Sequence, residues 1–419
     1  MSMAASAPNP PAVRHAAEAE RAQICLMTGG QDPHYAYGLA TALVAGGARL
    51  DVIGSNEVDL PEFHHTPGLR FLNLRGDQSG RGSAPAKIAR LLLFYIRLLG
   101  YSVRSRAGVV HILWNNRFEH FDRTLLLAWY RLLGKKIAFT AHNVNVRRRD
   151  GGDSWLNRLT LRIQYRLVHC IFVHTERMKA ELMTDFGVPA RRICVIPYGI
   201  NNAVPETAVT LAEARAKLDL PAAERVLLCF GAIAPYKGFD LLLESLRLLH
   251  ARGIHPRVVI AGKPKGGCDA YLAEIQNVAR TLPANSVRFD IGFVPDDRAE
   301  MYFKAADALL LPYRNIFQSG VLFLGFGYGL PAIATDVGDF REDVVDGETG
   351  FLAPRATPED FADAIAKFLA SPLGANVGAH RAGIRERVRA RHAWDTVARI
   401  TAGAYRDTCG AKLTISSST

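Results

Sequence analysis

Residues 312–351 read PYRNIFQSGVLFLGFGYGLPAIATDVGDFREDVVDGETGF. A polar loop that contains Gln318, Ser319 and Gly320 leads into an apolar run, which ends at residues 329–331, Gly-Leu-Pro. A short β-type stretch over residues 332–335 follows, and then a second polar loop. Loop, helix, strand and loop in this order are typical of the ligand-binding edge of a parallel α/β sheet. Because N–H groups at a helix N-terminus can hold an anion, the stretch predicts a site for an anionic ligand.

The rest of the chain repeats this alternation of short apolar runs and helical segments. We predict helices over residues 35–45, 238–252, 269–281 and 357–370, and one long last helix over residues 379–410. Strands are predicted at residues 24–27, 50–53, 109–113, 136–140, 170–173, 194–196, 226–230, 258–261, 287–289, 308–311 and 332–335. The rhythm runs twice, which indicates an α/β fold with two Rossmann-like domains.

The length of 419 residues also exceeds one ordinary hydrophobic core and fits two domains. We predict an N-terminal domain over residues 21–202 and a C-terminal domain over residues 203–390. The remaining segments are a disordered lead at 1–20, a C-terminal helix at 391–412 and a tail at 413–419.

Composition narrows the class of protein and its partners. Hydrophobic residues make up 49% of the chain and charged residues 22%, which is typical of a globular protein. The net charge of +11 favours an anionic partner, and nucleic acid, an anionic membrane and a phosphorylated substrate all remain open. The six cysteines show no CxxC spacing and several lie in apolar runs, so reduced thiols and a cytosolic setting are expected. The first twenty residues lack the apolar core of a signal peptide, and no transmembrane span is expected.

Seven landmarks along residues 22–408 together resemble the nucleotide-sugar glycosyltransferases of the GT-B fold, specifically family 4. They are Gly29-Gly30 with Tyr35, residues 140–143 (Thr-Ala-His-Asn), 173–176 (Val-His-Thr-Glu), 196–199 (Ile-Pro-Tyr-Gly), 230–238, 292–294 and the opening stretch. The resemblance implies two domains that face each other across a cleft, with the last helix crossing back to the first domain. It also implies a nucleotide-diphosphate-sugar substrate, UDP- or GDP-linked, and no cofactor.

The resemblance gives Lys237 and His142 as the catalytic residues. Lys237 lies in Gly231–Gly238, where the family places a lysine on the donor diphosphate; the alternative is a solvated first-turn lysine. Related enzymes often carry an arginine shortly before that lysine, whereas this chain has alanine at 232 and 234. His142 follows a strand end and is expected to orient the donor sugar, although a lone histidine is more often structural. No DxD-type acidic cluster is present, so metal-independent transfer is predicted.

Backbone positions complete the predicted donor site. Gly29 and Gly30 allow close approach of a substrate, or form a simple turn. The resemblance places Gly231 in the diphosphate loop and residues 292–294 (Gly292, Phe293 and Val294) where the backbone cradles the nucleobase.

The opening stretch departs from the family at two positions. Many family-4 enzymes carry two glutamates eight positions apart, which contact the donor sugar and the ribose; alignment on residues 329–331 puts Ile316 and Leu324 there. The chain offers instead Gln318 for the sugar, the amides of Ser319, Gly320 and Val321 for phosphate or sugar, and Glu342 for the ribose. A Ser-Gly in this loop is similar to a subgroup of bacterial polysaccharide transferases. Glu342 could equally cap a helix, and without the glutamate pair retention of configuration does not follow.

A basic stripe lies in the first half of the chain. Residues 87, 90, 94, 97, 101 and 104 are Lys87, Arg90, Phe94, Arg97, Tyr101 and Arg104, at helical spacing. We predict that this basic-aromatic face docks on the anionic inner leaflet of the plasma membrane, as the family often does with this region; the alternative is a core helix with a solvated basic face. Three further arginines, Arg147, Arg148 and Arg149, could grip a lipid-diphosphate acceptor or simply be solvated.

We therefore predict a peripheral, cytosolic-face hexosyltransferase that moves a sugar to a hydroxyl of a glycan or lipid-linked glycan in exopolysaccharide assembly, without nucleic acid as a partner. No general base is evident, although Asp32 and Asp150 are candidates. One alternative is a sugar-nucleotide epimerase of the same fold, which needs several cleft carboxylates. The other is a non-catalytic lipid- or nucleic-acid-binding module, which the high positive charge favours.

Overall fold

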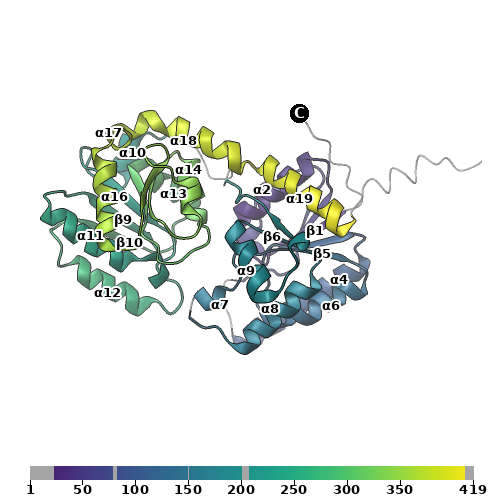
Figure 1. Ribbon diagram of the computed structural model, residues 1–419. Helices are drawn as coiled ribbons and strands as arrows, with labels where there is room; N and C mark the ends of the chain where they lie inside the picture. Colours follow the sequence, from purple (N-terminus) through teal and green to yellow (C-terminus); the bar gives the residue numbers. More distant parts are fainter. Residues whose placement is uncertain (1–22, 79–82, 150, 201–206, 411–419) are drawn as a thin grey trace, which may run out of the picture.

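The computed structural model describes residues 23–78, 83–149, 151–200 and 207–410. Figure 1 shows two α/β lobes side by side, joined along one edge by the last two helices. Each lobe is built on one parallel sheet, so the predicted GT-B architecture of two Rossmann-like domains is confirmed. The lead at 1–20 and the tail at 413–419 lie outside the described residues.

The N-terminal lobe holds a seven-stranded parallel sheet in the order β3-β2-β1-β4-β5-β6-β7. Its strands are β1 (Ile24–Met27), β2 (Leu50–Gly54), β3 (Leu69–Asn73), β4 (Val109–Ile112), β5 (Lys136–Thr140), β6 (Cys170–Val173) and β7 (Ile193–Val195). The helices are α2 (Pro33–Ala45), α3 (Pro61–His65), α4 (Ala84–Arg104), α5 (Glu119–Phe121), α6 (Leu127–Leu132), α7 (Val146–Arg149), α8 (Trp155–Leu167) and α9 (Glu176–Phe186). A π turn, η2 (Asp122–Leu126), joins α5 to α6, and short 3₁₀ turns are η1 (Asn56–Val58) and η3 (Ala190–Arg192).

The C-terminal lobe holds a six-stranded parallel sheet in the order β10-β9-β8-β11-β12-β13. Its strands are β8 (Val226–Phe230), β9 (Arg257–Gly262), β10 (Val287–Ile291), β11 (Ala308–Leu311), β12 (Ala332–Thr335) and β13 (Gly350–Ala353). The helices are α10 (Leu211–Lys217), α11 (Phe239–Ala251), α12 (Asp269–Ala279), α13 (Asp296–Ala305), α14 (Gly320–Gly327), α15 (Phe340–Asp343), α16 (Pro358–Ala370), α17 (Pro372–Ala375), α18 (Val377–His392) and α19 (Trp394–Cys409); η4 (Pro235–Lys237) precedes α11.

The sheet topology brings distant loops to one edge. Strands β8 and β11 pair in parallel at the centre of the C-terminal sheet, so the loops that follow them leave from neighbouring carboxyl ends. Ligands of doubly wound sheets bind outside these carboxyl ends. The loop after β8 carries Lys237, and the loop after β11 carries Gln318 and Ser319, so two predicted site segments meet there.

The predicted single last helix is wrong, because the structure has two helices, α18 and α19, that meet at Ala393. Ala393 is extended, with φ −61° and ψ 138°. The break lets α19 turn onto the N-terminal lobe, where it packs against α2, β5 and β6 (Figure 1). A Cβ built on Gly38 would lie 2.1 Å from Trp394 Cε2, and one on Gly199 would lie 2.4 Å from its Cη2. Trp394 is therefore wedged between two glycine positions, which fixes the start of α19.

Two edge strands, β3 and β13, were not predicted, although the neighbouring strands were. Among the described residues, no helix combines the length and the apolar character that crossing a bilayer requires.

Candidate functional site

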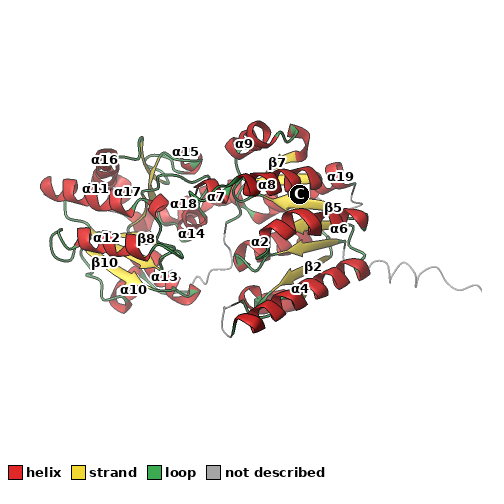
Figure 2. Ribbon diagram, turned by 90° about the horizontal axis from the view of Figure 1, so that it is seen from below, coloured by secondary structure: helices red, strands yellow, loops and turns green. Residues whose placement is uncertain are grey.

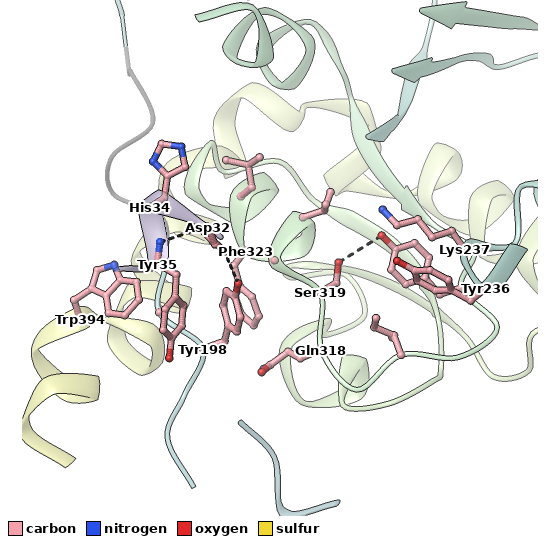
Figure 3. Close-up of a pocket in the computed structure, with 16 residues that line it drawn as sticks. Asp32, His34, Tyr35, Tyr198, Tyr236, Lys237, Gln318, Ser319, Phe323 and Trp394 are labelled. Atoms are coloured by element: carbon pink, nitrogen blue, oxygen red, sulfur yellow. Dashed lines mark hydrogen bonds between the residues drawn. The ribbon is translucent and has the colours of Figure 1, made fainter. Parts of the chain in front are cut away.

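A cavity of about 400 Å³ lies between the two lobes (Figure 3). Both lobes contribute side chains and backbone to its walls. From the N-terminal lobe and α19 it is lined by Asp32, His34, Tyr35, Tyr198, Gly199 and Trp394. From the C-terminal lobe it is lined by Tyr236, Lys237, Tyr313, Ile316, Gln318, Ser319, Gly320, Val321, Phe323 and Leu324. The structure thus brings Lys237 and the Gln-Ser-Gly-Val segment together in one pocket.

Lys237 ends the turn η4 on the C-terminal wall and is 6% exposed. Its Nζ lies 3.5 Å from the carbonyl oxygen of Phe230 and 5.3 Å from the ring centroid of Tyr313. The alternative of a solvated first-turn lysine is therefore wrong, since the ammonium group is enclosed. Gly231 has φ +96°, and a Cβ there would lie 3.3 Å from Lys237 Nζ. Glycine thus leaves space beside the amine that a ligand can use.

The N-terminus of α14 opens into the same pocket. Ser319 is the N-cap residue and is 5% exposed, but its side chain caps no helix N–H group. The first amides of a helix lack intrahelical partners, so those of Gly320 and Val321 can receive an anion. The Oε1 atom of Gln318 is buried and has no hydrogen-bond partner among the described residues. The α14 amides suit an anionic group, whereas the Gln318 carbonyl oxygen suits a hydroxyl that donates a hydrogen bond.

Ile316 and Leu324 also line the pocket. These are the positions at which the family alignment expects glutamates. The pocket therefore presents apolar side chains at two places where a sugar or ribose hydroxyl would otherwise be bound by a carboxylate.

The opposite wall begins with Asp32, the N-cap residue of α2. Its Oδ1 accepts a hydrogen bond of 2.9 Å from the Tyr35 amide, and its Oδ2 accepts one of 3.2 Å from the Tyr198 hydroxyl. The enclosed position raises the pKa of the Asp32 carboxyl, an effect that these two hydrogen bonds and the charge of nearby His34 partly offset. Figure 3 shows Asp32 and Trp394 on one side of the cavity and Lys237 on the other.

His142 is not among the residues that line this pocket. Its ring stacks on Trp114, with centroids 4.2 Å apart, and contacts the ring of Tyr35, which does line the pocket. Its Nδ1 lies 3.0 Å from Nε2 of His174. Burial, reinforced by the charge of His174, lowers the pKa of His142 well below its usual value, so the imidazole is neutral. A direct contact with the sugar stays a prediction; in the structure His142 supports Tyr35.

Gly29 and Gly30 form a left-handed turn with φ +60° and +73°. A Cβ on Gly29 would lie 2.6 Å from the carbonyl oxygen of Trp114, and one on Gly30 would lie 1.7 Å from Gln78 Nε2. Backbone packing therefore demands glycine at position 29, and at position 30 the left-handed backbone favours it, since the Gln78 side chain could move. Gly29 and Gly30 do not line the pocket, but the turn that they form leads to Asp32, which does.

The predicted nucleobase segment lies at a separate, smaller cavity. Gly292, Phe293 and Val294 line a hollow of about 230 Å³ at the carboxyl end of β10, and Phe293 is 76% exposed. Lys263 Nζ lies 5.8 Å from the centroid of the Phe293 ring.

Several predicted site residues are not brought to the interdomain pocket. Glu342 pairs with Arg391 of α18, and its neighbour Asp343 is buried against His392. Arg147 lies 3.6 Å from Glu119, and Arg148 forms a 2.6 Å ion pair with Asp185. The side chain of Arg149 and all of Asp150 lie outside the described residues.

The basic stripe does not form one exposed face. Phe94 is buried at 2% exposure and Tyr101 is half-buried, with its hydroxyl 2.7 Å from Asp51 Oδ2, so both aromatic members face the lobe. Arg90 is partly exposed and lies 3.6 Å from Asp77. The exposed face of α4 is apolar instead, with Ile88, Leu92, Leu93, Ile96 and Val103 each 44–66% exposed, beside the exposed Lys87, Arg97 and Arg104. Figure 2 shows α4 along the outer edge of its lobe.

Sequence reasoning named Tyr198 within the landmark at residues 196–199 but did not predict the aromatic wall of the pocket. Tyr198, Trp394 and Phe323 line it, and the rings of Tyr198 and Phe323 stack 5.3 Å apart across the two lobes. No motif in the sequence marks Phe323 and Trp394 as neighbours of Tyr198, and only the fold brings the three together. A partial signal existed in the glycine that follows Tyr198, which Trp394 requires.

Two family models match the chain, one in each lobe. The model described as Glycosyltransferase Family 4 matches residues 33–204, and the model described as Glycosyl transferases group 1 matches residues 224–371. Together the matched segments contain most residues of the interdomain pocket.

Curated relatives include D-inositol 3-phosphate glycosyltransferases. That of Kineococcus radiotolerans is 30% identical over 251 residues, which cover 56% of this chain and 56% of the relative. That of Streptomyces avermitilis is 31% identical over 245 residues, covering 56% and 51%. The chain spans about half the length of the curated relatives it matches.

Solved structures share the whole fold at low identity. A sucrose-phosphate synthase from Thermosynechococcus elongatus has a TM-score of 0.72 at 21% identity, covering 94% of this chain and 100% of that one. Anabaena HepE in complex with UDP and glucose has a TM-score of 0.70 at 15% identity, covering 91% and 99%. WaaG, a glycosyltransferase involved in lipopolysaccharide biosynthesis, has a TM-score of 0.59 at 16% identity, covering 92% and 99%.

Proposed function

Because the chain belongs to the family 4-like glycosyltransferases of the GT-B fold, we propose that it transfers a hexose from a nucleotide-diphosphate-sugar donor to an acceptor hydroxyl. The acceptor in this proposal is a glycan or lipid-linked glycan of surface polysaccharide assembly. Support comes from the likeness to HepE, solved with UDP and glucose, and to WaaG, involved in lipopolysaccharide biosynthesis.

One observation carries the donor part of the proposal: a buried ammonium group and the N-terminus of α14 face the same pocket. Lys237 would offset the charge that develops on the leaving diphosphate, and the Gly320 and Val321 amides would bind phosphate or sugar oxygens. These groups can act without a metal ion. Within the described residues, no cluster of three or more His, Cys, Asp or Glu suits a metal. We propose a metal-independent transfer with no cofactor, because the Lys237 ammonium group and the α14 amides can offset the charge of the leaving diphosphate.

A panel of UDP- and GDP-sugars, scored by unfolding free energy, tests donor binding. At 100 times its dissociation constant a true donor should add about 2.7 kcal/mol of stability. Lys237→Ala should abolish this gain and the transfer of sugar. Lys367→Ala, which removes an exposed lysine from α16, is the matched control and should keep both. Wild-type transfer by Lys237→Ala would refute the role of Lys237.

Two rival activities give different results in the same assays. An epimerase would convert the donor alone to an epimer without an acceptor. Of the described residues lining the pocket, Asp32 alone is a carboxylate, whereas epimerisation needs several. A non-catalytic lipid-binding module would show no transfer at all. Loss of transfer in Lys237→Ala, with liposome binding intact, would exclude it.

We also propose that the enzyme works on the inner face of the plasma membrane, docked through α4. The exposed apolar face of Ile88, Leu92 and Ile96 would enter the lipid interface, while Arg97 and Arg104 would meet anionic headgroups. The docking face in this proposal is apolar and basic, whereas the sequence predicted a basic-aromatic face. The two differ because the aromatic side chains of α4 pack into the core.

Sedimentation with phosphatidylglycerol liposomes tests this docking. The double substitution of Leu92 and Ile96 by Glu should release the protein, and charge reversal at Arg97 and Arg104 should do the same at low salt. Val278→Glu is the matched control, since Val278 is a 39%-exposed apolar residue on α12 of the other lobe. Unchanged sedimentation of both α4 variants would rule out docking through this helix.

A further inference from the structure

The carboxylate of Asp32 is unusual in its backbone, its position and its partners. Asp32 has φ 37° and ψ 79°, a left-handed conformation that few residues other than glycine adopt. Strained residues of this kind often mark functional sites. Among the described residues, it is also the one carboxylate that lines the interdomain pocket.

The partners of Asp32 come from two separate segments. The Tyr35 amide, in the first turn of α2, fixes Oδ1, and the Tyr198 hydroxyl, in the connection after β7, fixes Oδ2. Helix capping needs only one side-chain oxygen, so the hydrogen bond from Tyr35 accounts for the position of Oδ1 but not for that of Oδ2. The second oxygen is held by the residue that also stacks on Phe323 of the C-terminal lobe. Asp32 is therefore oriented by both the cap and the interdomain aromatic wall.

The wall opposite Asp32 leaves one buried hydrogen-bonding atom without a partner in the part of the chain that the structure describes. Gln318 lines the cavity, and its Oε1 atom has no hydrogen-bond partner among the described residues. Buried polar atoms without a partner are uncommon in folded proteins. A polyhydroxylated ligand would supply a donor hydroxyl for this amide oxygen.

We propose that Asp32 is the acceptor-side carboxylate, which accepts a hydrogen bond from the attacking hydroxyl and takes its proton. This deepens the proposed function and rests on it. Figure 3 shows Asp32 and Lys237 at opposite sides of the pocket, so the acceptor and the diphosphate have separate places. The acceptor is a sugar or polyol hydroxyl, because the neighbouring groups are hydrogen-bonding and aromatic.

The chemical step then balances as follows. The acceptor oxygen forms a bond to the anomeric carbon, and its proton passes to an oxygen of Asp32. The bond between the anomeric carbon and the diphosphate breaks, and its electron pair leaves with the diphosphate beside Lys237. The carboxyl loses its proton to water once the product has left.

Asp32→Asn separates this role from helix capping. Asparagine caps helices as well as aspartate does and tolerates the left-handed region, so the fold should persist. The nucleotide sugar that stabilises the wild type should stabilise the variant equally. Release of nucleoside diphosphate, with octyl glycosides or with water as acceptor, should fall about 10²-fold or more.

A pH profile gives a readout that a structural role would not move. The groups that face Asp32 are His34 and Tyr35 of its own helix and Tyr198 of the connection. Wild-type turnover should fall as the pH drops through the raised pKa of Asp32, because only the ionised carboxylate accepts the proton. The residual turnover of Asp32→Asn should lack this acidic limb.

Asp32→Ser, which keeps only the cap, should behave like Asp32→Asn. Asp395→Asn, at an exposed acid in the first turn of α19, is the matched control and should match the wild type. Turnover of Asp32→Asn within threefold of the wild type, with the acidic limb unchanged, would reduce Asp32 to a helix cap and overturn the proposal. If no nucleotide sugar stabilises the wild type, the proposed function fails instead.

Discussion

His111 should make the N-terminal lobe sensitive to mild acid. The side chain lies on β4 and is fully buried. Its Nδ1 is 2.5 Å from the Tyr405 hydroxyl of α19, and its Nε2 is 2.7 Å from Thr140 Oγ1 of β5. A neutral imidazole has one donor and one acceptor, so it can serve both hydroxyls. His111 thus links the returning C-terminal helix to the sheet.

Burial lowers the pKa of His111 from 6.5 to about 3. The unfolded chain therefore binds a proton below pH 6.5, while the folded protein does so only below about pH 3. Between these values the unfolded state holds more protons, so the free energy of unfolding falls as the pH falls. The slope is about 1.4 kcal/mol per pH unit, and at pH 5 the loss from His111 reaches about 2 kcal/mol.

Tryptophan fluorescence during urea unfolding measures this loss selectively. The four tryptophans, Trp114, Trp129, Trp155 and Trp394, all lie in the N-terminal lobe or in α19 docked on it. His111→Asn should lose stability at pH 7, because a buried ring is truncated, yet should lose about 2 kcal/mol less than the wild type on going to pH 5. His174, whose pKa burial lowers to about 4, should keep part of the acid sensitivity in the variant.

His380→Asn is the control, since it removes a histidine from an exposed position on α18. An equal loss of stability between pH 7 and pH 5 in the wild type and in His111→Asn would refute the reasoning. It would mean that His111 is protonated in the folded lobe or that water reaches it.

Three further predictions concern helix packing and a buried ion pair. Gly38→Ala should destabilise the N-terminal lobe by about 1–3 kcal/mol, because the new methyl group meets Trp394. Gly403→Ala should instead stabilise α19 by about 0.5–1 kcal/mol, because the nearest neighbour of the new Cβ would be 3.9 Å away. Both are read by the tryptophan signal. Arg215→Ala should cost the C-terminal lobe about 3 kcal/mol, because the buried Asp307 carboxylate loses its arginine partner at 2.8 Å and keeps Arg225 at 3.6 Å and the Val226 amide. Circular dichroism during urea unfolding would show a separate, earlier transition, and no change would contradict a buried ion pair.

Apolar runs predicted most of the strands, because parallel strands that are buried on both faces consist mainly of apolar residues. The strand at Leu69–Asn73 escaped notice because it lies at a sheet edge and mixes exposed and half-buried residues. The break at Ala393 has no proline or glycine to mark it. It follows from tertiary contacts, namely the Trp394 wedge and the hydrogen bonds of His392 to Tyr198 and Asp343.

The sequence predicted which loops reach the pocket, because strand ends determine where those loops lie. It predicted less well which individual side chains point into the pocket. Lys237 and Ser319 follow strand ends, and the sheet topology brings strand ends together. Charged side chains such as Glu342 and Arg148 instead found surface partners, which sequence spacing cannot foresee. Asp32 was a candidate without support until the fold placed Tyr198 beside it.

The two apolar positions in the pocket bear on which donor it accepts. A hydroxyl buried against Ile316 or Leu324 would lose its hydrogen bond to water without a replacement, at a cost of about 1–3 kcal/mol. Hydroxyls of a bound sugar must therefore point elsewhere, toward Gln318 or toward the Asp32 wall. In the proposed complex the donor diphosphate would keep Lys237 and the α14 amides, so the nucleotide end would be held much as the family resemblance implies. The sugar end then depends on Gln318, and truncating that amide should weaken binding of the nucleotide sugar but not of the free nucleoside diphosphate.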